Sequence, residues 1–349
     1  MVGLDIGSGA IKLVQMKKAG KGYRLEKFGV KTLDPELVVD GTVMDVGRVA
    51  SAIRSLLQEQ SVKTKNVALS MSGHSVIVKN VTLPLMKEDE LEASIQWEAE
   101  QYIPFSIQDV NLDFRILGPV ATPDGGVPVQ MEVLLVAVKK DKLAEYTGLV
   151  TEAGLHPVVV DVDAFALENA LEMNYGVNQS ESIAILNVGA GTTTLSVLKE
   201  GGVFVLARDI PFGGNRYNET VQQTFNVSHE DAERIKRLEL TERIDRGVVL
   251  NTLRDLNAEF ATEVARAFEY VTSTAHIGRI ARIFIGGGAS KISNLLSHLE
   301  EKMAMPISVI DPFHRVQISE KQFDLRFVHE MAPLAAVGVG LAMRCEGDC

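Results

Sequence analysis

Short apolar runs that end in a pair of glycines occur twice along the chain, 182 residues apart, as Gly7 is from Gly189. In each copy an apolar strand reaches a polar residue, turns on the glycines and returns as a second strand. The three strands of the first copy are expected at 2–6, 11–17 and 23–30, and those of the second copy at 182–188, 193–199 and 203–210. Such a repeat predicts two equivalent halves, each of which opens with a three-stranded meander.

The segment 66–153 departs from this pattern and predicts strand, strand, helix, strand, strand and helix, which indicates a small α/β unit inserted into the first half. We expect a hairpin loop at 123–126 and a left-handed helix stop at Gly154. Helices are expected at 46–60, 87–102, 141–153, after Asp163, within 215–276 with a cap at Ser228, near 292–301 and at 332–343. Further strands are expected at 67–71, 75–83, 109–117, 129–138, 157–161, 279–285 and 307–310.

Composition narrows the class of protein. A chain of 349 residues has room for about two domains, and 46% apolar and 23% charged residues are typical of a soluble globular protein. The net charge of −11 argues against binding to nucleic acid. Two cysteines, Cys345 and Cys349, make no disulfide framework and indicate a reducing compartment. No signal peptide or membrane span is evident, and the apolar stretch 331–343 is expected to be a buried helix, so any membrane role would come through a partner.

The glycine turns carry the candidate chemistry. A turn of this kind leaves backbone N–H groups bare at its tip, which suits a phosphate group. Glycine lets the backbone come close, the Ser8 hydroxyl can donate, and the Asp5 carboxylate can hold the waters around Mg²⁺. A tight hairpin with a solvated Lys12 would also explain the first turn, because short glycine motifs occur by chance. Two copies favour a nucleotide held between the halves.

Two meander-and-helix halves with an insertion in the first resemble the actin-type ATPase fold, which actin, sugar kinases, heat-shock chaperones and FtsA share. We therefore expect an α/β, actin-like (ribonuclease H-like) two-domain fold with an inserted small α/β subdomain. The resemblance implies subdomain 1A at 1–65 and 154–180, 1C at 66–153, 2A at 181–212 and 277–349, and the helical 2B at 213–276.

The resemblance also implies a site for ATP or ADP with Mg²⁺. The two turns would hold the terminal phosphates, Asp5 would reach Mg²⁺ through water, and the glycines at 286–288 would lie against the purine. The helix with Glu233 and Lys236 would reach the ribose and base. The cofactor-binding residues expected on this basis are Asp5, Gly7, Ser8, Gly9, Lys12, Asn187, Gly189, Gly191, Thr192, Thr193, Gly214, Asn215, Glu233, Lys236, Gly286, Gly287 and Gly288.

Simpler explanations for several of these positions stay open at this stage. Glu233 and Lys236 lie three residues apart on one helix face and could form a surface ion pair. Gly214 and Asn215 could present N–H groups to the nucleotide or simply begin a helix after Gly213. The glycine run could be a strand-to-helix turn that needs clearance.

Two positions bear on catalysis. Asn187 stands where the superfamily usually has Asp, and an amide carries no charge and accepts no proton, which puts metal affinity and hydrolysis in doubt but not phosphate binding. Asp163 opens a helix that resembles the first connecting helix of the superfamily, where a polar residue is positioned against the attacking water. It is the candidate catalytic residue, with a helix N-cap as the alternative.

The most specific stretches of the chain lie in the insertion, at 75–79, 83–86, 97–105 and 109–114, and a further one lies at 332–334. With them, essentially the whole chain resembles the PilM family, the actin-like cytoplasmic components of the type IV pilus inner-membrane platform. The candidate partner-binding residues are Ser75, Val76, Ile77, Lys79, Trp97, Tyr102 and Phe105. The aromatic ones could instead form a small core, or could line an edge where a peptide docks. The chain starts almost directly on its first strand, so any short leader of the family is expected to be missing.

The function implied is a cytoplasmic ATP-binding scaffold, peripheral at the inner membrane, that docks the N-terminal cytoplasmic peptide of a PilN-like membrane protein. Pilus motor ATPases and self-association are further partners that the resemblance suggests. A small-molecule kinase of the superfamily would need a clear carboxylate base, and an FtsA-like filament-forming tether would need a C-terminal amphipathic helix, which the terminal 344–349 segment does not form.

Overall fold

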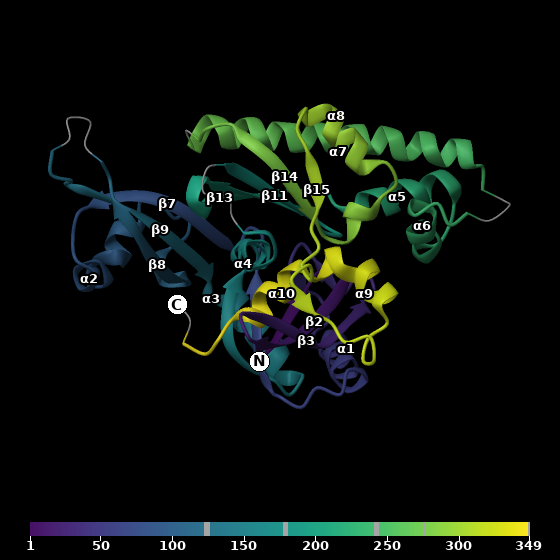
Figure 1. The fold of residues 1–349 in the computed structure, drawn as a ribbon, viewed down its shortest axis with the longest axis horizontal. Helices are drawn as coiled ribbons and strands as arrows, with labels where there is room; N and C mark the ends of the chain where they lie inside the picture. Colours follow the sequence, from purple (N-terminus) through teal and green to yellow (C-terminus); the bar gives the residue numbers. More distant parts are fainter. Residues whose placement is uncertain (122–125, 177–180, 241–243, 276, 348–349) are drawn as a thin grey trace. The chain divides into compact units, whose positions relative to one another are not determined.

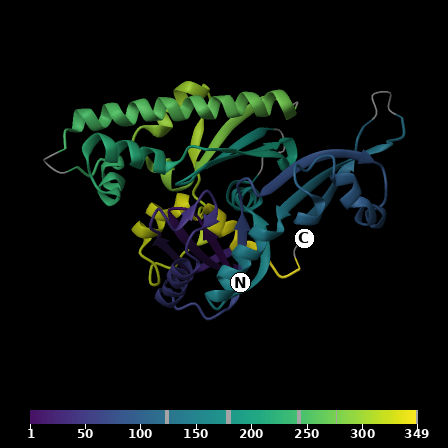
Figure 2. The same ribbon diagram turned by 180° about the vertical axis from the view of Figure 1, so that it is seen from behind.

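The computed structural model of the chain (Figures 1 and 2) describes residues 1–121, 126–176, 181–240, 244–275 and 277–347. It divides into two compact units, one made of Met1–Ser70 and Val150–Cys349 and the other of Met71–Leu149. The expected hairpin loop at 123–126 lies largely, and Cys349 wholly, outside the described residues, while Cys345 is exposed and forms no disulfide within the described part of the chain.

The first unit holds two sheets with the same order of strands. One sheet runs β10 (His156–Val162), β6 (Asn66–Met71), β1 (Val2–Ile6), β2 (Ala10–Ala19), β3 (Gly22–Thr32) and β16 (Val316–Gln317). The other runs β15 (Ile307–Val309), β14 (Ile280–Gly286), β11 (Ser182–Val188), β12 (Thr193–Lys199) and β13 (Val203–Ile210). In both sheets the three strands of the meander are antiparallel. The first strand of each meander also pairs in parallel with a later strand, β1 with β6 and β11 with β14. The duplication expected from the sequence is therefore present.

Helices pack on each sheet where their apolar faces predict. In the first half, α1 (Val46–Glu59) contacts β2 and β3, while α4 (Asp163–Tyr175) and α10 (Ala336–Met343) contact each other, and α10 also contacts β1 and β2. In the second half, α5 (Gly214–Phe225) contacts α6 (His229–Lys236) and α7 (Arg246–Ala275), and α7 lies along β13 and α8 (Leu295–Met303) (Figure 1). Each half thus has the layered core of an α/β fold.

The contact between α10 and α4 depends on a glycine. A Cβ atom on Gly340 would lie 1.8 Å from the Ala166 carbonyl oxygen, so only glycine lets α10 approach α4 this closely. The stretch Leu325–Met343 is long and apolar enough to cross a membrane by composition, but 61% of its 18-residue apolar window is buried in the protein, and it is divided among α9 (Leu325–Met331), a 3₁₀ turn at Ala332–Ala335 and α10. Its burial places it in the protein core, as the sequence predicts.

The second unit is a three-stranded antiparallel sheet, β7 (Val76–Pro84), β9 (Gln130–Lys139) and β8 (Val110–Pro119), with α2 (Glu88–Ala99) packed on it. Leu91, Ile95 and Ala99, which recur every four residues, form the buried face of α2. The helix α3 (Lys140–Glu152) follows β9. The unit lies within the predicted insertion 66–153, and the finer division into four subdomains stays a prediction.

The predicted elements agree with the structure except at a few places. Helix α2 ends at Ala99 rather than 102, and the helix expected near 292 begins at Leu295 after a 3₁₀ turn at Gly288–Lys291. The sequence reasoning missed α9, the short strand β16 and a two-stranded hairpin, β4 (Val38–Val39) with β5 (Thr42–Val43).

Candidate functional site

The two glycine turns have the same internal hydrogen bond. Gly7 N donates to the Ala10 carbonyl at 3.1 Å, and Gly189 N donates to the Thr192 carbonyl at 2.9 Å. The strand register is also equivalent, since Asp5 faces Lys12 across the first pair of strands and Asn187 faces Thr194 across the second. The duplication therefore extends to the backbone geometry of the turns.

The two turns face each other within the first unit. A Cβ atom on Gly9 would lie 2.9 Å from the Ala190 Cβ, and one on Gly191 would lie 3.5 Å from the Ser8 Oγ. Within the described chain, the backbone N–H groups of Ser8, Gly9, Ala190 and Gly191 have no hydrogen-bond partner. Four unpaired donors on two facing turns form a cradle suited to an anion with several oxygens.

An ion pair lies beside the first turn. Lys12 Nζ is 2.8 Å from Asp5 Oδ2 and donates to the Ala10 carbonyl at 3.3 Å. Asp5 is buried, and burial raises its pKa to about 6, with the nearby Asp163 carboxylate adding to the rise and Lys12 opposing it. The carboxyl group of Asp5 therefore exchanges its proton about two pH units above the ordinary range of an aspartate.

Asp163 lies near Asp5, directly after the end of β10. It is the first residue of α4, whose N-cap is Val162 without a side-chain cap, so the alternative of Asp163 as the N-cap is wrong. Its Oδ1 accepts a hydrogen bond from Ser70 Oγ at 2.5 Å, and Ser70 is in β6. The carboxylate is thereby oriented by a neighbouring strand rather than by its own helix.

The start of α5 does not offer free N–H groups. Gly214 N donates to the Gly189 carbonyl at 2.9 Å, and Asn215 N donates to the Ala190 carbonyl at 2.7 Å. A Cβ on Gly213 would lie 2.5 Å from the Ala190 carbonyl oxygen. The expectation that Gly214 and Asn215 present N–H groups to a nucleotide is therefore wrong: these donors hold the second turn in place.

Thr193 is also occupied. It is fully buried, and its Oγ1 donates to the Phe212 carbonyl at 2.7 Å. Its side chain is consequently unavailable to a ligand, and its role is to tie the second turn to the end of β13. Asn187 and Thr192 remain half-exposed beside the turn, where the sequence places them.

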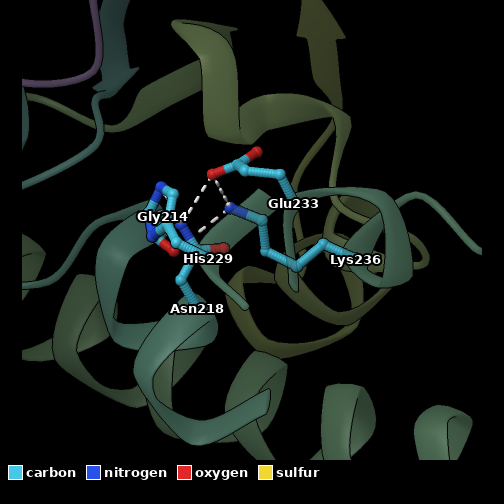
Figure 3. Close-up of polar contacts among 5 residues, drawn as sticks. All are labelled: Gly214, Asn218, His229, Glu233 and Lys236. Atoms are coloured by element: carbon cyan, nitrogen blue, oxygen red, sulfur yellow. Dashed lines mark hydrogen bonds and ion pairs between the residues drawn. The ribbon is translucent and has the colours of Figure 1, made fainter. Parts of the chain in front are cut away.

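Glu233 and Lys236 form an ion pair in which the lysine is buried and the glutamate is partly exposed (Figure 3). Lys236 Nζ lies 2.8 Å from Glu233 Oε1 and donates to the Gly214 carbonyl at 3.2 Å, and Lys236 is only 5% exposed. Asn218 Nδ2 donates to the same Glu233 oxygen at 2.6 Å and lies 3.5 Å from a ring nitrogen of His229. The ion pair considered from the sequence is therefore present, but its lysine is buried rather than at the surface.

The charges of this pair are adjusted by their surroundings. Burial lowers the pKa of Lys236, against the attraction of Glu233. Burial alone would raise the pKa of Glu233, but the Lys236 ammonium and the hydrogen bonds from Lys236 and Asn218 lower it. The second carboxylate oxygen of Glu233 has no hydrogen bond among the described residues, so it can accept one from a ligand. Asn218 and His229 were missed because nothing local to them in the sequence marks this contact.

The glycine run at the end of β14 has two distinct roles. Gly287 has φ +85°, its N–H donates to the Pro333 carbonyl at 2.8 Å, and a Cβ there would lie 2.3 Å from the Val188 carbonyl oxygen. Here glycine is required for the turn. Gly288 is exposed, and its Cβ would meet only the Leu334 side chain at 3.6 Å, so the surface at Gly288 is open. Gly286 is buried beside Ile310.

Among the described residues no group of three His, Cys, Asp or Glu side chains could hold a metal ion by itself. This fits the way Mg²⁺ binds beside nucleotides, with one or two carboxylates, several waters and the phosphates. Asp5 has the chemistry for such a contact, but Lys12 already occupies one of its oxygens.

The candidate partner residues of the insertion differ in how far they are exposed. Tyr102, Phe105 and Ile77 pack against the core of the second unit, and the Lys139 ammonium lies 4.3 Å from the centre of the Phe105 ring. Lys79 is exposed and lies 5.5 Å from the Tyr102 ring centre. Ser75 and Val76 are half-buried at the start of β7. Trp97, by contrast, is 80% exposed on α2.

Comparison with known proteins gives a family. Residues 3–346 match the family model described as type IV pilus assembly protein PilM. The structure matches that of a PilM–PilN type IV pilus biogenesis complex with a TM-score of 0.86 and 29% identity, over 98% of this chain and 97% of that one. Cell division protein FtsA of Bacillus subtilis is 21% identical over 259 residues, which are 68% of this chain and 57% of FtsA. MreB5 of Spiroplasma citri bound to ADP has the same fold, with a TM-score of 0.52 and 13% identity over 97% of this chain and 94% of that one.

Proposed function

Because the chain belongs to the PilM family of type IV pilus assembly proteins, we propose that it is an ATP- or ADP-binding scaffold whose inserted unit docks a membrane-anchored partner. The observation that supports the nucleotide is the pair of facing turns with four unpaired backbone N–H groups. They would hold the phosphates from both halves of the first unit. The phosphate oxygens of a bound nucleotide would supply the acceptors that these N–H groups lack.

Other residues of the first unit fit the rest of a nucleotide. The free oxygen of Glu233 would accept a hydrogen bond from a ribose hydroxyl, while Lys236 acts through Glu233 as a positioning residue. The open surface at Gly288 would lie against the purine. Asp5 would attract Mg²⁺ through water, and Asp163 would orient a water at the terminal phosphate. Since Asn187 is neutral, turnover would be slow and the nucleotide would serve mainly to hold the halves together.

Titration calorimetry with Mg²⁺ and ATP tests this assignment. Gly288→Val places a branched side chain on an exposed position without a backbone clash, and it should reduce ATP affinity at least tenfold. Gly7→Val should also reduce ATP affinity, because it places a side chain on the first turn. The fold should tolerate this change, since the Cβ would lie 2.9 Å from the flexible Lys12 ammonium rather than from backbone. Gly278→Val is the matched control, since a Cβ on this exposed loop residue meets nothing within 4 Å. Unchanged affinity in both site variants would overturn the placement.

The docking surface on the inserted unit is the outer face of α2. Trp97 lies opposite the buried face of the helix, and residues 88–100 carry six carboxylates and no basic side chain. Cytoplasmic segments next to a membrane span carry an excess of Lys and Arg. The N-terminal cytoplasmic peptide of a PilN-like protein would therefore meet an acidic face with an aromatic anchor, and the scaffold would sit at the inner membrane through this partner.

Fluorescence anisotropy with a labelled N-terminal peptide of a PilN-like partner tests the docking. Trp97→Ala should weaken binding at least tenfold, and the affinity of the wild type should fall as salt is added. Lys79→Glu should have a smaller effect on peptide binding, because Lys79 lies on β7 and not on the α2 face that is proposed to contact the peptide. Gln96→Ala, an exposed neighbour on the same helix, is the control. If neither Trp97→Ala nor Lys79→Glu weakens binding, the insertion is not the docking surface.

A small-molecule kinase remains the second candidate, because Asp163 and Asp5 are carboxylates beside the proposed phosphate cradle. Brisk ATP hydrolysis or phosphate transfer by the wild type would favour it over a scaffold.

A further inference from the structure

The first half of the first unit contains a short two-stranded hairpin. Its strands β4 and β5 pair through Val39 and Thr42, which leaves Asp40 and Gly41 as the two residues of the turn. Both have positive φ, 48° at Asp40 and 70° at Gly41, as a type I′ turn requires.

The tip of this hairpin lies at the facing glycine turns. A Cβ atom on Gly191 would be 4.0 Å from Asp40 Oδ1 and 3.5 Å from Ser8 Oγ. Asp40 is exposed and has no hydrogen bond or ion pair among the described residues. Three segments that are far apart in the sequence therefore meet at one point, and one of them brings an uncompensated carboxylate.

A carboxylate in this position would repel a phosphate that the four N–H donors beside it hold without a cation. Two anions close together repel each other. A divalent cation removes the conflict, because it attracts both groups. The usual carboxylates cannot fully supply this charge, since Lys12 pairs with Asp5 and Asn187 is neutral.

We propose that Asp40 is a carboxylate of the cation site, which binds Mg²⁺ through water when the nucleotide phosphates lie between the two turns. This inference rests on the proposed nucleotide binding. It assigns to the β4–β5 hairpin the negative charge that the second turn lacks at Asn187. Nucleotide affinity in this chain should then depend on Mg²⁺ through Asp40.

Titration calorimetry of ATP in excess Mg²⁺ and in excess EDTA tests the assignment through binding alone. Asp40→Asn keeps the turn, because Asn-Gly is a favoured type I′ pair, and it removes only the charge. We expect the variant to bind ATP more weakly than the wild type in Mg²⁺ and more tightly in EDTA. The dissociation constant in EDTA divided by that in Mg²⁺ should be about tenfold smaller in the variant than in the wild type. Glu36→Gln removes one charge from an exposed residue of the same segment and should leave the ratio unchanged.

Each other result overturns the assignment in a distinct way. A ratio equal to that of the wild type would mean that Asp40 does not contact the cation. An equal gain in affinity in both buffers would mean that Asp40 only repels the phosphates. If the wild type binds no nucleotide in either buffer, the proposed function fails and this inference fails with it. Circular dichroism of the variant confirms that the fold is intact.

Discussion

Removing the charge of Glu233 tests how the α6 helix is held. Glu233→Gln keeps the length and shape of the side chain but leaves the Lys236 ammonium, 2.8 Å away, without an anion. Lys236 is 5% exposed, so water cannot replace the carboxylate. The Lys236 Nζ also donates to the Gly214 carbonyl at the start of α5, so the loss is felt in both helices.

The size of the effect follows from the geometry. Two unit charges 2.8 Å apart attract each other by about 6 kcal/mol at an effective dielectric constant near 20. The Glu233 side chain is 39% exposed, and solvent screening reduces the net loss to about 2–3 kcal/mol. Lys236→Met should cost less than Glu233→Gln, because the carboxylate that it leaves behind can turn to water while the ammonium cannot.

Hydrogen–deuterium exchange followed by mass spectrometry measures this loss locally. A loss of 2 kcal/mol corresponds to about thirtyfold faster exchange in α5 and α6. Peptides from β7 to β9 in the second unit provide the internal control. If α6 exchanges in Glu233→Gln as it does in the wild type at pH 7, or if Lys236→Met is the more damaging change, the pair does not hold these helices as argued.

Three further predictions concern the turns and the core. Asn187→Asp should raise Mg²⁺-dependent phosphate release, while the wild type should remain far below the ~1–100 s⁻¹ of dedicated phosphoryl-transfer enzymes; a variant no faster than the wild type would refute this. Gly340→Ala should lower the free energy of unfolding by at least about 3 kcal/mol, because its Cβ would lie 1.8 Å from the Ala166 carbonyl oxygen, while Gly278→Ala should have no measurable effect in the same thermal unfolding experiment. Because the pKa of Asp5 is raised to about 6, its carboxyl group is neutral below that pH, so calorimetry should find Mg²⁺-dependent ATP affinity rising between pH 5 and 7 in the wild type but not in Asp5→Asn.

The turns could be predicted from the sequence because their rules are local. A strand that ends in a polar residue and two glycines specifies the same backbone in both halves, and the 182-residue repeat shows that the two belong together. The β4–β5 hairpin obeys an equally local rule. Asp40-Gly41 between Val39 and Thr42 is a typical type I′ signal, so this hairpin could have been predicted as well.

Other features depend on contacts that no local rule specifies. The Thr193 hydroxyl and the N–H groups of Gly214 and Asn215 are taken up by carbonyls of other segments. Likewise the i, i+3 spacing of Glu233 and Lys236 is the same for a surface pair and a buried one. Burial here comes from α5 packing on α6, which is a tertiary contact. Sequence reasoning therefore identified candidate residues but not which of their atoms are free.

The difference between the two halves bears on what a nucleotide would do here. The pair Asp5 and Lys12 corresponds in register to Asn187 and Thr194, and the hydroxyl of Thr194 donates to Asp209 at 2.8 Å. The second half therefore repeats the backbone of the first but not its charges. Phosphate binding by backbone N–H groups needs only the repeated backbone, whereas metal-assisted hydrolysis needs the charges. This site has the phosphate-binding backbone in both halves but the charged pair in one half only. Such a site is suited to holding its halves together around a nucleotide. This is the property that a scaffold requires.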